Sequence, residues 1–179
     1  MGSKGLYLID KKEDMNEEFG KLLSMMDYTR MTTVAEVKNL TAEQLDFLVN
    51  EDANSIGMLL EHMNSVEKTY QIDTFEKREY TEEDIQMLNP GLDLGEAARQ
   101  QIKGNPIEFY LEQLEQTREK TIETFRKLPD TWLFEQAPFW DGEPANNYFK
   151  WFHVMEDELN HRGQIRLIKK IMRKTSSVI

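Results

Sequence analysis

Apolar residues recur every three or four positions from about Ala145 to Lys174, near the end of this 179-residue chain. This spacing predicts one continuous amphipathic helix. At about 1.5 Å per residue, the helix would be roughly 43 Å long. Its predicted buried side comprises Trp151, Phe152, Met155, Leu159, Ile165, Ile168, Ile171 and Met172.

Three further stretches show the same helical periodicity. They run from about Met15 to Tyr28, from about Asp52 to Gln71, and from Asn105-Pro106 to Leu128-Pro129. Thr41 followed by Gln44 forms a capping box, which predicts an additional short helix over 42–47. We therefore predict an all-α protein with the architecture of a four-helix bundle.

The connection between the second and third long helices is unusually long. Residues 72–104 are polar and include Asn89-Pro90-Gly91 and Gly95, so we expect irregular structure with one helical turn at Thr81–Leu88. A connection of this length indicates a crossover rather than a tight hairpin.

A second connection, over residues 132–144, is rich in aromatic residues. One interpretation is a hydrophobic cap on one end of the bundle. The other is the wall of a substrate pocket.

Charge and cysteine content narrow the functional classes. The formal net charge is −11, and the basic residues are dispersed except near Lys169–Lys174. Nucleic-acid-binding surfaces show a basic stripe, so we expect no nucleic-acid partner.

The absence of cysteine excludes disulfides and a cysteine nucleophile and is consistent with a cytoplasmic protein. The apolar stretch Leu6–Ile9 is too short for a signal peptide or a membrane span, so we expect no membrane association.

The three histidines suggest a metal site. His153, Asp157 and His161 follow one another at intervals of four residues and therefore share one helix face. A pair of ligands at i and i+4 can hold one metal ion. A further ligand must come from another helix, and His62 is the candidate. Imidazole and carboxylate ligands suit zinc, iron, nickel or manganese.

Ordinary structural roles would also explain these residues. Asp157 and His161 could form an ion pair worth about 0.2–0.5 kcal/mol. We interpret Glu61, Glu156 and Glu158 as solvated residues rather than bases. Gly163 within a helix costs about 1 kcal/mol relative to alanine, and close approach of a neighbouring helix or a partner subunit would offset this cost.

Two segments resemble signatures of the DinB-like (YfiT-like) superfamily. Residues 152–165, FHVMEDELNHRGQI, resemble its last helix, and residues 53–62, ANSIGMLLEH, resemble its second helix. The resemblance covers about residues 12–174. It implies that residues 1–179 form a single domain with an up-down-down-up four-helix bundle and a long crossover connection.

The resemblance also implies a metal site. Members commonly bind a divalent ion, often nickel or zinc, through one histidine of the second helix and two of the last helix. Carried onto this chain, the ligands are His62, Asp157 and His161, with aspartate in place of one histidine. His153 becomes a neighbour of the ligands or an alternative ligand. The aspartate either completes a two-histidine, one-carboxylate set or leaves the site without metal.

Two functions follow from the resemblance. The first is a metal-dependent enzyme, either a hydrolase or an S-transferase that uses a low-molecular-weight thiol; Glu61 or Glu158 could assist as a base, and no residue stands out as catalytic. The second is a non-catalytic, stress-associated protein with a degenerate metal site. The resemblance implies a homodimer in both cases.

Overall fold

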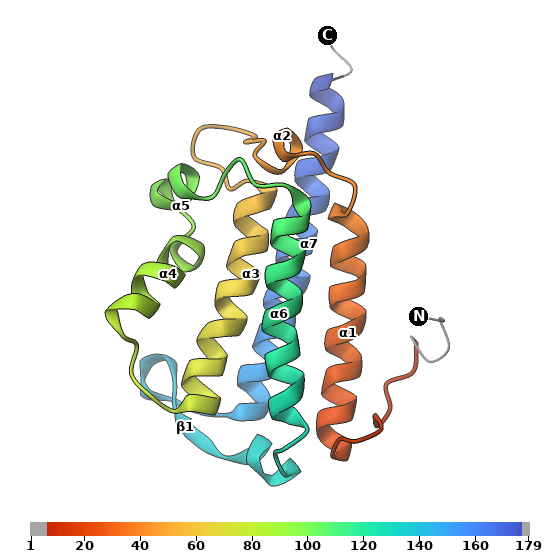
Figure 1. The fold of residues 1–179 in the computed structure, drawn as a ribbon, viewed down its shortest axis with the longest axis vertical. Helices are drawn as coiled ribbons and strands as arrows, with labels where there is room; N and C mark the ends of the chain where they lie inside the picture. Colours follow the sequence, from red (N-terminus) through yellow and green to blue (C-terminus); the bar gives the residue numbers. More distant parts are fainter. Residues whose placement is uncertain (1–6, 177–179) are drawn as a thin grey trace.

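Four long helices form the body of the molecule. A computed structural model describes residues 7–176, which contain α1 (Glu17–Val37), α3 (Ile56–Tyr70), α6 (Ile107–Phe125) and α7 (Asn147–Ser176). α1 and α7 run in one direction and α3 and α6 in the other, as Figure 1 shows. The predicted all-α bundle with up-down-down-up connectivity is therefore confirmed.

The beginnings of the helices follow from capping. The predicted capping box of Thr41 starts α2 (Ala42–Leu45). α3 begins at Ile56 rather than near Asp52, because the Ser55 hydroxyl accepts a hydrogen bond of 3.2 Å from the Met58 N–H. α1 runs from Glu17 to Val37, so residues 27–37 continue the first helix.

The crossover between α3 and α6 contains more helix than predicted. It comprises a π-helical segment (Gln71–Glu76), α4 (Glu82–Asp93) and α5 (Glu96–Gln101). The helix predicted at Thr81–Leu88 is present as the first part of α4, but the prediction of irregular structure in the rest of the connection was wrong.

Packing explains why the expected helix break did not occur. Pro90 lies inside α4, and the buried Gly91 beside it lies close to Ser65 and Glu61 of α3. Tertiary contact therefore overrides the local propensity of the Asn-Pro-Gly sequence.

The aromatic connection after α6 has two parts. The first is a 3₁₀-helix, Asp130–Phe134, in which Trp132 is buried and stacks on Phe19 with ring centroids 5.9 Å apart. The second is an antiparallel hairpin of β1 (Gln136–Pro138) and β2 (Pro144–Asn146), joined through a 3₁₀ turn at Trp140–Gly142. The first part caps the bundle, as one interpretation predicted, and the second part lines a pocket, whose binding of a substrate stays a prediction.

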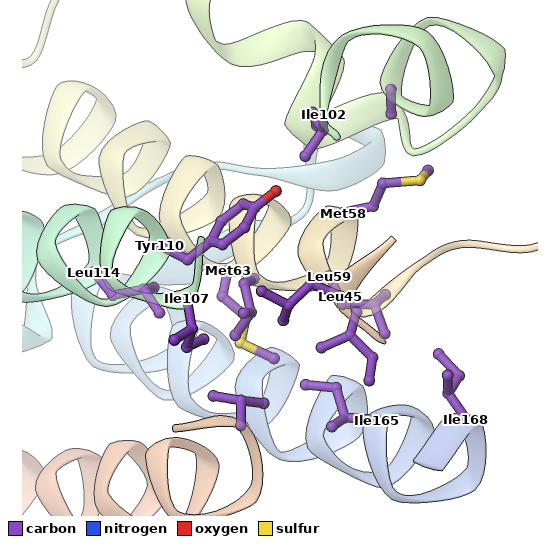
Figure 2. Close-up of a cluster of buried hydrophobic side chains, with 14 residues drawn as sticks. Leu45, Met58, Leu59, Met63, Ile102, Ile107, Tyr110, Leu114, Ile165 and Ile168 are labelled. Carbon is purple, nitrogen blue, oxygen red and sulfur yellow. The ribbon is translucent and has the colours of Figure 1, made fainter. Parts of the chain in front are cut away.

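Two apolar clusters make up the core. The upper core lies where α3 and α6 begin, and Figure 2 shows how Leu59 and Tyr110 lie across from Ile165 within it. It comprises Val37, Leu45, Ile56, Met58, Leu59, Leu60, Met63, Ala98, Ile102, Ile107, Tyr110, Leu114, Ile165 and Ile168. The lower core lies at the opposite end and comprises Phe19, Leu22, Leu23, Met26, Val66, Tyr70, Phe125, Trp132, Leu133, Trp151, Val154 and Met155.

A buried ionic layer, formed by Arg30, Glu67, Arg118 and Glu158, separates the two clusters. Each of the four long helices contributes one of these residues. The Glu67 carboxylate accepts bonds of 2.7 and 3.0 Å from Arg118 and one of 3.2 Å from Arg30. Arg30 also donates to both carboxylate oxygens of Glu158, at 3.0 and 3.2 Å.

The electrostatics of this layer depend on its pairing. Burial by itself raises the pKa of Glu67, which is fully buried, but the charges of Arg118 and Arg30 hold that pKa below its usual value. Thr121 adds a further hydrogen bond of 2.8 Å to the same carboxylate. Glu67 is therefore charged in the interior and fixes both guanidinium groups.

The inner side of α7 differs in part from its prediction. Trp151, Met155 and Ile165 are buried, but Phe152 and Leu159 are exposed. The latter two are seven residues apart and lie outside the faces that α7 presents to α1 and α3.

No helix among the described residues is both long and apolar enough to cross a membrane.

Replacing Glu67 tests the ionic layer. Glu67→Gln removes the charge that compensates Arg118 and should lower the free energy of unfolding by about 3–5 kcal/mol, measured by urea denaturation. The matched control is Glu76→Gln, which weakens a partly exposed pair with Lys120 and should cost about 0–1 kcal/mol. Equal losses in the two variants would contradict the assigned role of the layer.

Gly163 offers the opposite test. A Cβ atom added at this position meets no described atom within 4 Å, so the predicted close approach of a neighbouring helix of the bundle was wrong. Gly163→Ala should raise the free energy of unfolding by up to about 1 kcal/mol, because alanine favours the helix. A destabilised variant that loses a dimer at the same time would instead indicate a partner subunit at Gly163.

Candidate metal centre

His62 lies in α3 and is oriented by α4. Its Nδ1 atom lies 2.9 Å from the carbonyl oxygen of Gly91. Gly91 is in the last turn of α4, where carbonyl groups lack partners within the helix. Because a carbonyl only accepts hydrogen bonds, Nδ1 carries the hydrogen, and Nε2 is left as the ligand atom. That Nε2 atom lies 3.5 Å from Oδ1 of Asp157.

The close approach of α4 to α3 depends on Gly91. A Cβ atom added at Gly91 would lie 2.3 Å from Oγ of Ser65 and 3.1 Å from the carbonyl oxygen of Glu61. Any side chain here would push α4 away from α3. The glycine therefore sets the position of the carbonyl that orients His62.

α7 contributes the other two side chains. Nε2 of His161 lies 3.3 Å from Oδ1 of Asp157, and the imidazole rings of His161 and His62 have centroids 4.6 Å apart. One ligand atom from each of the three residues lies within 4.8 Å of the others. The structure thus brings together the three residues expected to be ligands, from two antiparallel helices.

The three side chains could hold a divalent ion. Their exposed fractions are 14% for His62, 13% for Asp157 and 9% for His161. Two of their polar atoms, Oδ2 of Asp157 and Nδ1 of His161, are buried without a hydrogen-bond partner. Two imidazoles and one carboxylate are a ligand set that divalent transition metals accept, so the residues fit the implied metal.

The charge at this centre comes from Asp157. Burial raises the pKa of Asp157, but hydrogen bonds and charges of His161 and His62 outweigh burial and hold the pKa well below its usual value. Burial lowers the pKa of His62, whereas Asp157 and the Gly91 carbonyl raise it, with a net increase. The centre therefore attracts positive charge, from protons or from a metal ion.

His153 lies outside this group of three. It precedes Asp157 by one helical turn, and its Nδ1 atom lies 3.2 Å from the hydroxyl oxygen of Tyr70. Its ring contacts Trp140, with centroids 5.1 Å apart. A role as a neighbour of the ligands stays a prediction.

The two glutamates considered as bases lie in different surroundings. Glu158 is buried and paired with Arg30, so its interpretation as a solvated residue was wrong, and it belongs to the ionic layer. Glu61 is partly buried and accepts a bond of 3.2 Å from Asn64, while burial raises its pKa. Glu156 is exposed, as predicted.

Gly91→Ala tests the support of His62. We expect metal affinity to fall by about 10–100-fold, as is typical when a partner that orients a ligand is lost, measured by calorimetric titration with zinc. The control is Gly163→Ala, a glycine in open space on α7, which should bind zinc as the wild type does. Restoration of affinity in the double variant Ser65→Gly/Gly91→Ala would confirm the steric cause, and unchanged affinity in Gly91→Ala would contradict it.

Comparison with known proteins places the chain in a family. A search of curated proteins found no match. The family model for mycothiol-S-transferase matches residues 21–174, which include all four long helices except the first residues of α1 and the last residues of α7. The predicted DinB-like assignment is confirmed, because this family is part of the DinB-like superfamily. The chain belongs to the mycothiol-S-transferase family.

Proposed function

We propose that this protein is a metal-dependent S-transferase that joins a low-molecular-weight thiol, mycothiol by the name of its family, to an electrophilic carbon. The observation that carries this proposal is the convergence of His62, Asp157 and His161 within 4.8 Å in a member of this family. We propose nickel or zinc as the ion.

In the proposed reaction, the sulfur of the thiol forms a bond to the electrophilic carbon. The bond between that carbon and its leaving group breaks, and the leaving group departs with the electron pair. The thiol proton passes to solvent. The protein contains no cysteine, so the reacting sulfur belongs to the substrate, and no protein thiol competes for the centre.

A divalent ion bound here would act as a Lewis acid and favour the deprotonated thiol. The protein residues prepare the position for this chemistry. Asp157 supplies a carboxylate that is charged at neutral pH, and the Gly91 carbonyl holds one imidazole in a single tautomer. Low exposure of the three side chains limits competition by water.

No general base is needed from the glutamates for this reaction. Glu158 is held by Arg30 through two hydrogen bonds, and removal of either partner would leave a buried charge unpaired. This pairing favours thiol transfer over a mechanism in which Glu158 activates water for hydrolysis.

Variants of Asp157 test the proposal. Wild-type protein should bind one divalent ion per chain, measured by elemental analysis after dialysis, and should convert chlorodinitrobenzene and mycothiol to the thioether. Asp157→Ala should lose both properties. Asp157→His, which introduces the imidazole usual in DinB-like proteins, should retain both.

The control for these variants is Glu156→Ala, on the adjacent exposed residue, which should behave as the wild type does. A wild-type protein that takes up neither zinc nor nickel would contradict the metal site. A wild-type protein that binds metal and forms no thioether would contradict transfer and support a non-catalytic role.

A further inference from the structure

A pocket lies beside the hairpin, outside the group formed by His62, Asp157 and His161. It has a volume of about 490 Å³ and is lined by the rings of Phe139, Trp140 and Phe149 together with Gln136, Glu143 and Asn146. This volume is in the range of small-molecule sites. Trp140 is 61% exposed and Phe149 is 42% exposed. These apolar rings are exposed to solvent around the pocket. An apolar ligand that covers them would remove apolar surface from water, which favours binding.

The pocket wall is held in place by the backbone. Strands β1 and β2 pair in register, with Gln136 opposite Asn146 and Pro138 opposite Pro144. The Phe139 N–H donates a bond of 2.8 Å to the carbonyl oxygen of Glu143 across the turn. The pocket is therefore preformed on a paired hairpin rather than on an irregular loop.

One face of α7 connects this pocket to the metal centre. Phe149, His153, Asp157 and His161 follow one another at intervals of four residues, so each lies about one turn, roughly 6 Å, from the next. Contacts of His153 with Trp140 and Tyr70 fill the turn between them. The pocket therefore lies at least two turns of α7, roughly 12 Å, from Asp157, with His153 between them.

The charges around the pocket disfavour an anionic ligand. Glu143 lines it, and the whole protein has a formal net charge of −11. The nearby cation, Lys150, is buried, and its ammonium group donates a bond of 2.7 Å to Asp73. Its charge is therefore already compensated.

We propose that this pocket binds a flat, uncharged aromatic group of the electrophilic substrate, which packs against Trp140 and Phe149 while the reacting carbon, on another part of the same molecule, extends past His153 to the metal centre. The inference rests on the proposed S-transfer and specifies the class of acceptor. His153, held by the Tyr70 hydroxyl, lies between this aromatic group and the metal centre.

An unreactive analogue tests the pocket directly. 1,3-Dinitrobenzene has no leaving group, and it quenches tryptophan fluorescence on contact. Trp132 and Trp151 are buried, whereas Trp140 is exposed, so saturable quenching reports occupancy beside Trp140. We expect such quenching with the wild-type protein, and at least tenfold weaker binding of 3,5-dinitrobenzoate, because the carboxylate meets negative charge.

Two phenylalanine variants provide the matched comparison. Phe149→Ala keeps Trp140 as the reporter and should weaken 1,3-dinitrobenzene binding about tenfold. It should raise KM for an acceptor that carries such an aromatic group apart from its reacting carbon by a similar factor and leave KM for the thiol unchanged. Phe134→Ala removes another exposed ring, outside the pocket lining, and should match the wild type in every measurement.

The outcomes separate this inference from the proposed transfer. Asp157→Ala should bind the analogue normally while losing metal and activity. Saturable binding that is lost in Phe149→Ala supports the pocket even if no thioether forms, and that result would contradict only the transfer. Equal binding in Phe149→Ala and Phe134→Ala, or no saturable quenching in the wild type, would overturn the pocket assignment.

Discussion

The charged carboxylate of Glu67 in the interior is the constraint on which the arrangement of the four helices depends. A buried charge is stable only when it is paired and hydrogen-bonded, and Glu67 obtains this pairing from Arg30 on α1 and from Arg118 and Thr121 on α6. A shift of one helix along its axis, or a rotation about it, would leave a guanidinium or carboxylate group unpaired. Apolar side chains above and below tolerate small rearrangements, whereas this layer does not. The ionic layer therefore fixes the register of the bundle.

The same layer positions the candidate metal centre, because both depend on neighbouring residues of α7. Glu158 points toward Arg30 on α1, while Asp157, the preceding residue, points toward His62 on α3. Fixing the rotation of α7 through Glu158 thus directs Asp157 and His161 at α3. On its other side His62 is held by α4, through the Gly91 carbonyl. The crossover is consequently part of the site and not only a connection between helices.

Most of the fold could be predicted from local spacing. Spacing also placed His153, Asp157 and His161 on one helix face, but only the resemblance to the DinB-like superfamily selected His62, Asp157 and His161 as the ligand set. Helical periodicity located the long helices, and the interval of four residues placed Asp157 beside His161. The local sequence did not predict the structure where a contact with a residue distant in the chain determines it. Pro90 and Gly91 predict a turn locally, yet packing against Ser65 keeps them in a helix. Glu158 has the sequence surroundings of a solvated residue, and only the approach of Arg30 explains its burial.

X-ray absorption spectroscopy of the zinc-loaded protein tests the central claim, that His62, Asp157 and His161 together hold the ion. We predict two imidazole nitrogens at about 2.0–2.1 Å and a carboxylate oxygen at about 2.0–2.2 Å, with solvent completing the coordination. Recruitment of a third imidazole, which only His153 could provide, would contradict this ligand set. A spectrum with oxygen ligands alone would contradict the metal centre itself.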